Sequence, residues 1–123
     1  LECYRGRSDY LLLYESESDI VNLAPDFRKL ARAEGRGTIV TAPGSDVDFV
    51  SRFFVPGAGI DEDPVTGSAH TTLTPFWSER LGRKTLKARQ LSARGGYLEC
   101  SLAGDRTLIA GRAMLYLKGE IYV

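Results

Sequence analysis

The sequence is poor in the residues that build metal centres and disulfide frameworks. Of its 123 residues, two are cysteines and one is a histidine. Cys3 and Cys100 form no C-x-x-C pair, and His70 has no Cys/His cluster around it. We therefore expect no metal site and no thiol-redox site. Reduced thiols are the expectation for a cytoplasmic protein, and a Cys3–Cys100 disulfide is the alternative that the sequence leaves open.

The sequence also lacks an excess of charge and a long apolar run. Sixteen Lys and Arg balance sixteen Asp and Glu, which argues against nucleic acid or an anionic membrane as the main partner, because both select basic faces. The longest apolar run, residues 10–14, is far below the roughly 20 residues that cross a bilayer, and no segment resembles a signal peptide. We expect a cytoplasmic chain that folds as one domain.

The apolar pattern predicts an α+β fold, with about seven strands in a curved mixed or antiparallel sheet wrapped around one central helix. The helix is predicted over residues 68–81, with Gly82 closing it and Pro75 kinking or breaking it. Shorter helices are predicted over residues 20–23 and 25–33. The strands are predicted at 9–15, 38–42, 49–55, 86–91, 97–102 and 109–117, with a last strand ending at Val123.

Two details of the strands bear on the core. Cys100 alternates with polar neighbours, which places it facing inward. Gly111 and Ala113 lie on one face of the strand predicted at 109–117, where small residues would let a helix lie close to the sheet.

The segment Asp61–Ser68 is the candidate site. Three carboxylates stand in a row at 61–63, and a helix is predicted to begin five residues later. A helix start exposes backbone N–H groups and a partial positive charge, which bind carboxylate or phosphate. Gly67 would let a ligand approach the backbone, Ser68 adds a hydroxyl, and Thr66 can cap. An acid beside such an anion pocket can give and take a proton.

The same residues also suit ordinary cap and turn chemistry, which the residues alone favour. A phosphate-binding P-loop is a weak option, because no lysine follows Gly67. His70 could act as a base, but a packed or surface histidine is the stronger interpretation. Ser68 and His70 do not form a hydrolase elbow, because G-x-S-x-G is missing.

The motifs resemble those of the phenazine-biosynthesis PhzF-like proteins. The run E-D-P-V-T-G-S-A at 62–69 is similar to that family's E-D-P-x-T-G-S-A signature. The run R-Q-L-S-A-R-G-G at 89–96 is similar to its R-Q-x-S-x-R-G-G stretch, and the segments at 22–27, 41–44 and 48–54 follow in family order. The resemblance covers essentially the whole chain.

The resemblance implies a fold similar to diaminopimelate epimerase, with two pseudo-symmetric halves and an active site in the cleft between them. It implies cofactor-free isomerisation by proton transfer on a small carboxylate such as a dihydro-hydroxyanthranilate. Asp63 matches the acidic residue near the catalytic glutamate, and Ser68 matches the serine at the substrate carboxylate. Asp63 and Ser68 are the expected catalytic residues, and Thr66, Gly67 and Ser68 are the expected substrate-binding residues.

The chain, residues 1–123, looks like the C-terminal half of such a protein. It begins with Leu1 rather than Met, and the catalytic glutamate and pocket histidine of the family belong to the N-terminal half. We expect the chain alone to be inactive, the missing half to be a partner, and exposed apolar surface to drive homo-oligomerisation. The alternatives are a non-catalytic anion-binding or dimerisation module and, ranked low, an amino-acid racemase or epimerase, because Ser68 stands where those racemases place a cysteine.

Overall fold

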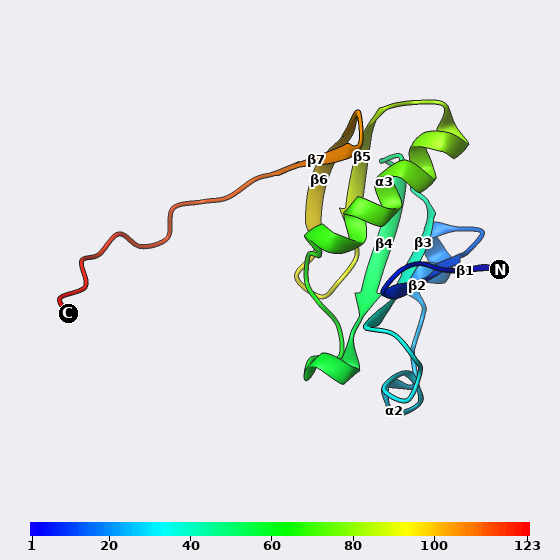
Figure 1. The fold of residues 1–123 in the computed structure, drawn as a ribbon, viewed down its shortest axis with the longest axis horizontal. Coiled ribbons are helices and arrows are strands. Elements are labelled where there is room, and N and C mark those ends of the chain that lie inside the picture. The colour runs from blue at the N-terminus through cyan, green and yellow to red at the C-terminus, as the bar shows by residue number, and fades with distance from the viewer.

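One seven-stranded sheet forms the framework of the fold, and its strands lie in sequence order (Figure 1). The computed structural model describes residues 1–123. The strands are β1 (Glu2–Arg5), β2 (Asp9–Leu13), β3 (Gly37–Pro43), β4 (Phe49–Phe54), β5 (Thr85–Gln90), β6 (Gly96–Ala103) and β7 (Arg106–Gly111).

Two parallel pairs in this sheet determine where the helices lie. β2 pairs parallel to β3 and β4 pairs parallel to β5, whereas all other neighbours are antiparallel. The first crossover holds α1 (Glu17–Val21) and α2 (Phe27–Leu30), and the second holds the 3-10 helix η1 (Pro56–Ala58) and α3 (Gly67–Leu81). Because β2 and β4 run in opposite directions, crossovers of one hand place their helices on opposite faces.

Each face of the sheet carries its own core. On one face, Ala69, Leu73 and Trp77 of α3 pack on alternate residues of the strands, including Ile39 and Phe49. On the other face, a smaller cluster gathers beneath the short helices around Ile20, Val40, Ala42, Val50 and Phe54. The fold is therefore α+β, a mixed sheet packed against one central helix, as the sequence predicted.

Helix α3 runs unbroken through Pro75 and ends at Gly82, whose φ of 64° is the left-handed conformation that glycine adopts without strain. Of the predicted kink or break at Pro75, the break does not occur. Leu73, Thr74, Trp77 and Ser78 are all buried around the exposed proline, so packing on both sides offsets the hydrogen bond that proline removes. At 15 residues this is the longest helix, and no helix in the structure is long and apolar enough to span a membrane.

The short helices differ from their predicted bounds. α1 begins at Glu17, because Ser16 and Asp19 form a capping box. α2 covers only Phe27–Leu30, with the side chain of Asp26 accepting a hydrogen bond from the Lys29 N–H at 3.1 Å. The prediction of a helix over 25–33 was thus too long at both ends.

The C-terminal segment also differs from the prediction. β7 ends at Gly111, and residues 112–123 form neither the rest of the strand predicted at 109–117 nor a last strand. This segment extends away from the sheet (Figure 1) and is exposed throughout. A strand needs a neighbour for its backbone groups, and this segment has none within the chain. The seventh strand is instead β1, at the opposite edge.

Helix α3 does lie close to β7, as predicted, but Gly111 is not the reason, since a side chain there would meet only the Tyr97 carbonyl, at 3.7 Å. The tight position is Gly96, where a Cβ would collide with the Val65 side chain. This contact brings the start of β6 against the loop that precedes α3.

Candidate active site

The loop before α3 is fastened to the sheet by side chains from β5 and the turn that follows it. Gln90 accepts a hydrogen bond from the Thr66 N–H at 2.8 Å and donates to the Asp63 carbonyl at 2.6 Å. The Ser92 hydroxyl donates to the Pro64 carbonyl at 2.7 Å. Together with the contact between Gly96 and Val65, these bonds hold four successive loop residues.

Asp63 lies at the rim of this loop and is half-buried. Its Oδ2 accepts a hydrogen bond from the Thr66 hydroxyl at 2.5 Å, while the same hydroxyl oxygen accepts one from Gln90 Nε2 at 3.1 Å. Thr66 is the N-cap residue of α3, but its side chain does not cap the helix. The prediction that the Thr66 side chain caps the helix is therefore wrong, because its hydroxyl hydrogen is directed to Asp63 instead.

The first turn of α3 is open to solvent. Gly67 and Ser68 are both exposed, and the chain offers no acceptor to their backbone N–H groups. The first N–H groups of a helix have no partner within the helix and carry the positive end of its dipole. The tip is therefore free to bind an anion a few residues from Asp63.

The three neighbouring carboxylates have different environments. Glu62 forms a bidentate ion pair with Arg52, at 2.8 and 2.9 Å, and the same guanidinium donates to the Leu23 carbonyl at 2.9 Å. This pair ties the loop to the short-helix face, and it raises the pKa of Arg52 above its ordinary value. Asp61 is exposed. Of the three carboxylates, Asp63 is thus the one that the loop directs toward the helix tip.

His70 is packed in the core rather than poised for chemistry. It is 0% exposed, its Nδ1 lies 2.7 Å from the Thr66 carbonyl, and its ring packs against Phe49. Because a carbonyl only accepts, Nδ1 carries the hydrogen. Its Nε2 has no partner, and burial lowers the pKa of His70 below its ordinary value of 6.5. Of the two interpretations of His70, the structure supports the packed one.

The aromatic side chains of this region brace the helix. Phe49 stacks on Trp77 with ring centroids 5.7 Å apart, and Trp77 Nε1 donates to the Thr41 hydroxyl at 3.0 Å. Cys3 and Cys100 are free, and Cys100 is buried as predicted. No group of three or more His, Cys, Asp or Glu side chains is placed to hold a metal ion.

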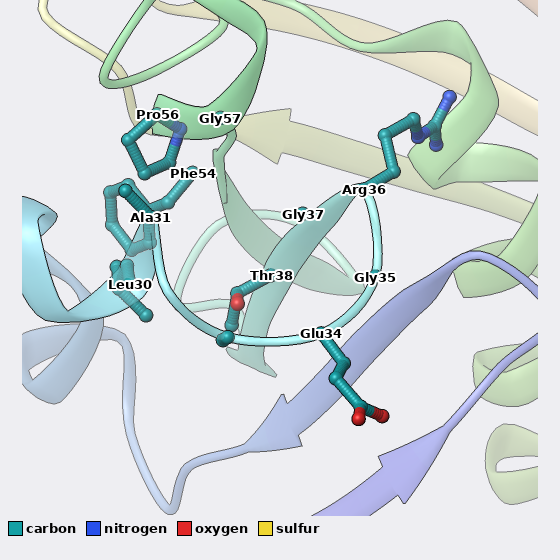
Figure 2. Close-up of a pocket in the computed structure, with 11 residues that line it drawn as sticks. Leu30, Ala31, Glu34, Gly35, Arg36, Gly37, Thr38, Phe54, Pro56 and Gly57 are labelled. Carbon is teal, nitrogen blue, oxygen red and sulfur yellow. The ribbon is translucent and has the colours of Figure 1, made fainter.

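Three hollows in the surface lie away from the helix tip. Figure 2 shows one of them, a cavity of about 20 Å³ between the turn after α2 and η1, with Glu34 and Arg36 directed away from it. These two side chains pair instead with Arg5 and Asp9. Two larger hollows, of about 430 and 240 Å³, also exclude residues 61–70. The tip residues Gly67 and Ser68 are themselves exposed, so the candidate site lies at the surface.

The structure brings together all four predicted site residues, Asp63, Thr66, Gly67 and Ser68, and adds Gln90 and Ser92. The last two belong to the R-Q-x-S run, to which sequence reasoning attached no role. A glutamine buried within a strand needs a hydrogen-bond partner, so Gln90 could have indicated a polar group nearby. The sequence does not say which group this is, because the partner lies in a loop 24 residues earlier.

The structure is thus an α+β domain in which an exposed helix tip lies beside a fixed carboxylate. Comparison with known proteins shows the family to which it belongs. Residues 3–119 match the family described as phenazine biosynthesis-like protein (PhzC-PhzF). The chain belongs to this family.

Its relatives include two uncharacterized isomerases of Pseudomonas aeruginosa, 56% and 50% identical to it; each alignment covers 94% of this chain and 45% or 44% of the relative. The crystal structure of a PhzF family protein from Enterococcus faecalis is 47% identical, with a TM-score of 0.91, and the match covers 98% of this chain and 46% of that one. The chain thus spans about half the length of the relatives it matches.

The buried, neutral His70 predicts a pH-dependent stability. The unfolded chain takes up a proton near pH 6.5, whereas the folded chain does so only at lower pH. Stability is therefore full above about pH 6.5 and falls as the pH falls below it, with a slope of up to about 1.4 kcal/mol per pH unit. Urea unfolding between pH 7.5 and 5.5 measures this slope.

His70→Asn is the matched control, because its amide can donate to the Thr66 carbonyl without titrating. His70 is the only histidine, so the slope between pH 7.5 and 5.5 should flatten in this variant. An equal slope in both proteins would contradict a neutral His70 in the folded state.

Proposed function

We propose that the chain is the C-terminal half of a PhzF-like isomerase that moves a proton within a small carboxylate without a cofactor. In this proposal the helix tip at Gly67 and Ser68 binds the substrate carboxylate, and Asp63 stands beside the reacting carbon as a proton carrier. The observation that carries it is the pairing of an uncapped, exposed helix tip with a carboxylate fixed by its own loop. The relatives named isomerases support the reaction class.

Gly67 supports the binding role for a separate reason. A Cβ built on Gly67 meets no atom within 4 Å, and its φ lies outside the left-handed region. Glycine is also a poor helix residue, costing about 0.5–1 kcal/mol relative to alanine in a helix interior. The fold therefore does not require glycine here, whereas a ligand that must reach the backbone N–H groups does.

The second half of the active site is proposed to come from the part of the relatives that this chain does not match. The tip lies open, and proton transfer at carbon is favoured where water is excluded. A general acid–base pair also needs a second group opposite Asp63, which by resemblance is a glutamate. We therefore expect the chain to be inactive on its own. The proposal also places the chain in the cytoplasm, in keeping with the free thiols of Cys3 and Cys100.

Binding at the helix tip is tested with Gly67→Ala. The added methyl group would stand where a carboxylate approaches, so we expect the variant to bind anthranilate about tenfold more weakly than the unchanged chain, the equivalent of one lost hydrogen bond to a charged group. The measurement is an NMR titration of the ¹⁵N-labelled chain with anthranilate, followed at the Ser68 and Ala69 amides.

Gly57→Ala is the matched control, because a Cβ there also meets no atom within 4 Å. It should bind as the unchanged chain does, and urea unfolding should show that neither substitution lowers stability. Equal affinity in all three proteins, or shifts centred away from residues 66–69, would refute the tip as the binding site.

Proton transfer by Asp63 is tested in the chain joined to the upstream half of its own gene product. With dihydro-hydroxyanthranilate in D₂O, we expect deuterium incorporation by the joined protein, none by the chain alone, and a loss of at least about 100-fold in Asp63→Asn, typical of a removed acid–base group. Mass spectrometry of the substrate measures the incorporated deuterium.

Asp61→Asn serves as the control, since Asp61 is exposed and makes no side-chain bond in the loop; it should leave the rate within about twofold, as surface changes do. Turnover by the chain alone would contradict the half-site proposal, and an active Asp63→Asn protein would remove Asp63 from the mechanism.

Self-association is the proposed behaviour of the chain when its other half is absent. The segment 112–123 exposes a run of large apolar side chains. These are Met114, Leu115, Tyr116, Leu117, Ile121 and Tyr122. Surface of this kind is normally covered by a partner, and here the partner is proposed to be the missing half or, without it, a second copy.

Sedimentation of the chain should therefore show a concentration-dependent oligomer, which the double substitution Leu115→Ser and Leu117→Ser shifts toward monomer. The double substitution Lys118→Ser and Glu120→Ser should leave the oligomer unchanged. A monomer at every concentration would count against the proposal.

A further inference from the structure

Gln90 uses its whole side-chain amide on the loop that carries Asp63. It lies on β5, at the end of the strand nearest the turn, and is 0% exposed. Its three hydrogen bonds go to Thr66 N, to the Thr66 hydroxyl and to the Asp63 carbonyl. None of these bonds goes to β4 or β6, the strands beside β5. Within the sheet, a buried apolar side chain could therefore replace that of Gln90.

The chemistry of these partners determines the orientation of the amide. The Thr66 N–H only donates, so it faces Oε1, and the Asp63 carbonyl only accepts, so it faces Nε2. If the amide were reversed, its NH₂ group would face the Thr66 N–H, which is also a donor, and its oxygen would face the Asp63 carbonyl, which is also an acceptor. The Nε2 group therefore also donates to the Thr66 hydroxyl oxygen, which leaves the hydrogen of that hydroxyl for another acceptor.

That acceptor is Asp63 Oδ2. The bonds run in one direction, from Gln90 Nε2 to Thr66 Oγ1 at 3.1 Å and from Thr66 Oγ1 to Asp63 Oδ2 at 2.5 Å. Successive bonds of this kind polarise and strengthen one another. The other carboxylate oxygen, Oδ1, takes no hydrogen bond from the chain and is the one left for a substrate.

We propose that Gln90 is a positioning residue of the active site, which acts through Thr66 to hold Asp63 in one rotamer with Oδ1 free to carry the proton. The inference rests on the proposed function of Asp63. It assigns Gln90 a role that differs from general support of the loop, because Gln90 also determines which way the Thr66 hydroxyl points.

Ser92 offers a matched comparison within the same loop. Its hydroxyl donates to the Pro64 carbonyl at 2.7 Å, one residue from Asp63, and accepts from the Gly95 N–H at 3.0 Å. Removing it weakens the loop without touching Thr66 or Asp63. A side chain that merely anchors the loop would therefore behave like Ser92.

The experiment measures the side-chain rotamers of Asp63 by NMR scalar couplings in the full chain, together with hydrogen exchange of the Thr66 amide. Three substitutions are compared with the unchanged chain. They are Gln90→Met, Gln90→Glu and Ser92→Ala. Gln90→Met removes the acceptor of the Thr66 N–H, and exchange of that amide should rise about tenfold, the loss of one hydrogen bond.

Gln90→Glu keeps that acceptor, so exchange should stay within about threefold of the unchanged chain, but it makes two carboxylates compete for the one Thr66 hydroxyl hydrogen. Asp63 should average over rotamers in both Gln90 variants and stay in one rotamer in Ser92→Ala. Thr66→Val, which removes only the hydroxyl, should reproduce the Asp63 averaging and keeps the test decisive if Gln90→Met does not fold.

A single Asp63 rotamer in Gln90→Glu and Thr66→Val would overturn the proposal, and so would equal averaging in Ser92→Ala. These measurements use no ligand. If the unchanged chain fails to bind anthranilate, the proposed function fails while the rotamer result still stands.

Discussion

The candidate site depends on the way in which Thr66 is held. Its N–H is bonded to Gln90, its hydroxyl lies between Gln90 and Asp63, and its carbonyl faces His70 Nδ1 at 2.7 Å. A residue with every polar group bonded has one conformation, and Thr66 is the residue from which α3 begins. The direction of the helix tip and the position of Asp63 therefore depend on the same four hydrogen bonds of Thr66.

The sheet and the helix core make this arrangement rigid. Phe49 contacts two residues of α3, since its ring stacks on Trp77 and also packs against His70. Trp77 is itself tied to β3 through Thr41, whose hydroxyl donates to the Val50 carbonyl at 2.7 Å. Movement of the helix tip would disturb buried aromatic packing, which is among the most costly contacts to break.

The three neighbouring carboxylates at 61–63 differ in what binds them. Glu62 pairs with Arg52, which also donates to the carbonyl of Ile20 in α1 and to that of Leu23 just after it, and so connects the site loop to the opposite face of the sheet. Asp63 is left with one hydroxyl as its partner. The helix tip at Gly67 and Ser68 stays exposed.

Local sequence determined much of this protein. The stripe of apolar residues and the closing Gly82 predicted α3 within one residue, the alternation around Cys100 placed that residue in the core, and the E-D-P-V-T-G-S run located the loop and the helix tip. These features depend on neighbours a few residues apart, for which spacing is sufficient evidence.

Only the tertiary structure decided which polar groups and which strands pair with one another. Gln90 reaches loop residues 24 and 27 positions earlier in the sequence, Arg52 selects Glu62 from three adjacent acids, and the segment after Gly111 stays extended because no strand lies beside it. Hydrogen-bond partners for buried polar groups and for strand edges come from segments that only the folded chain brings together, so no local pattern could have named them.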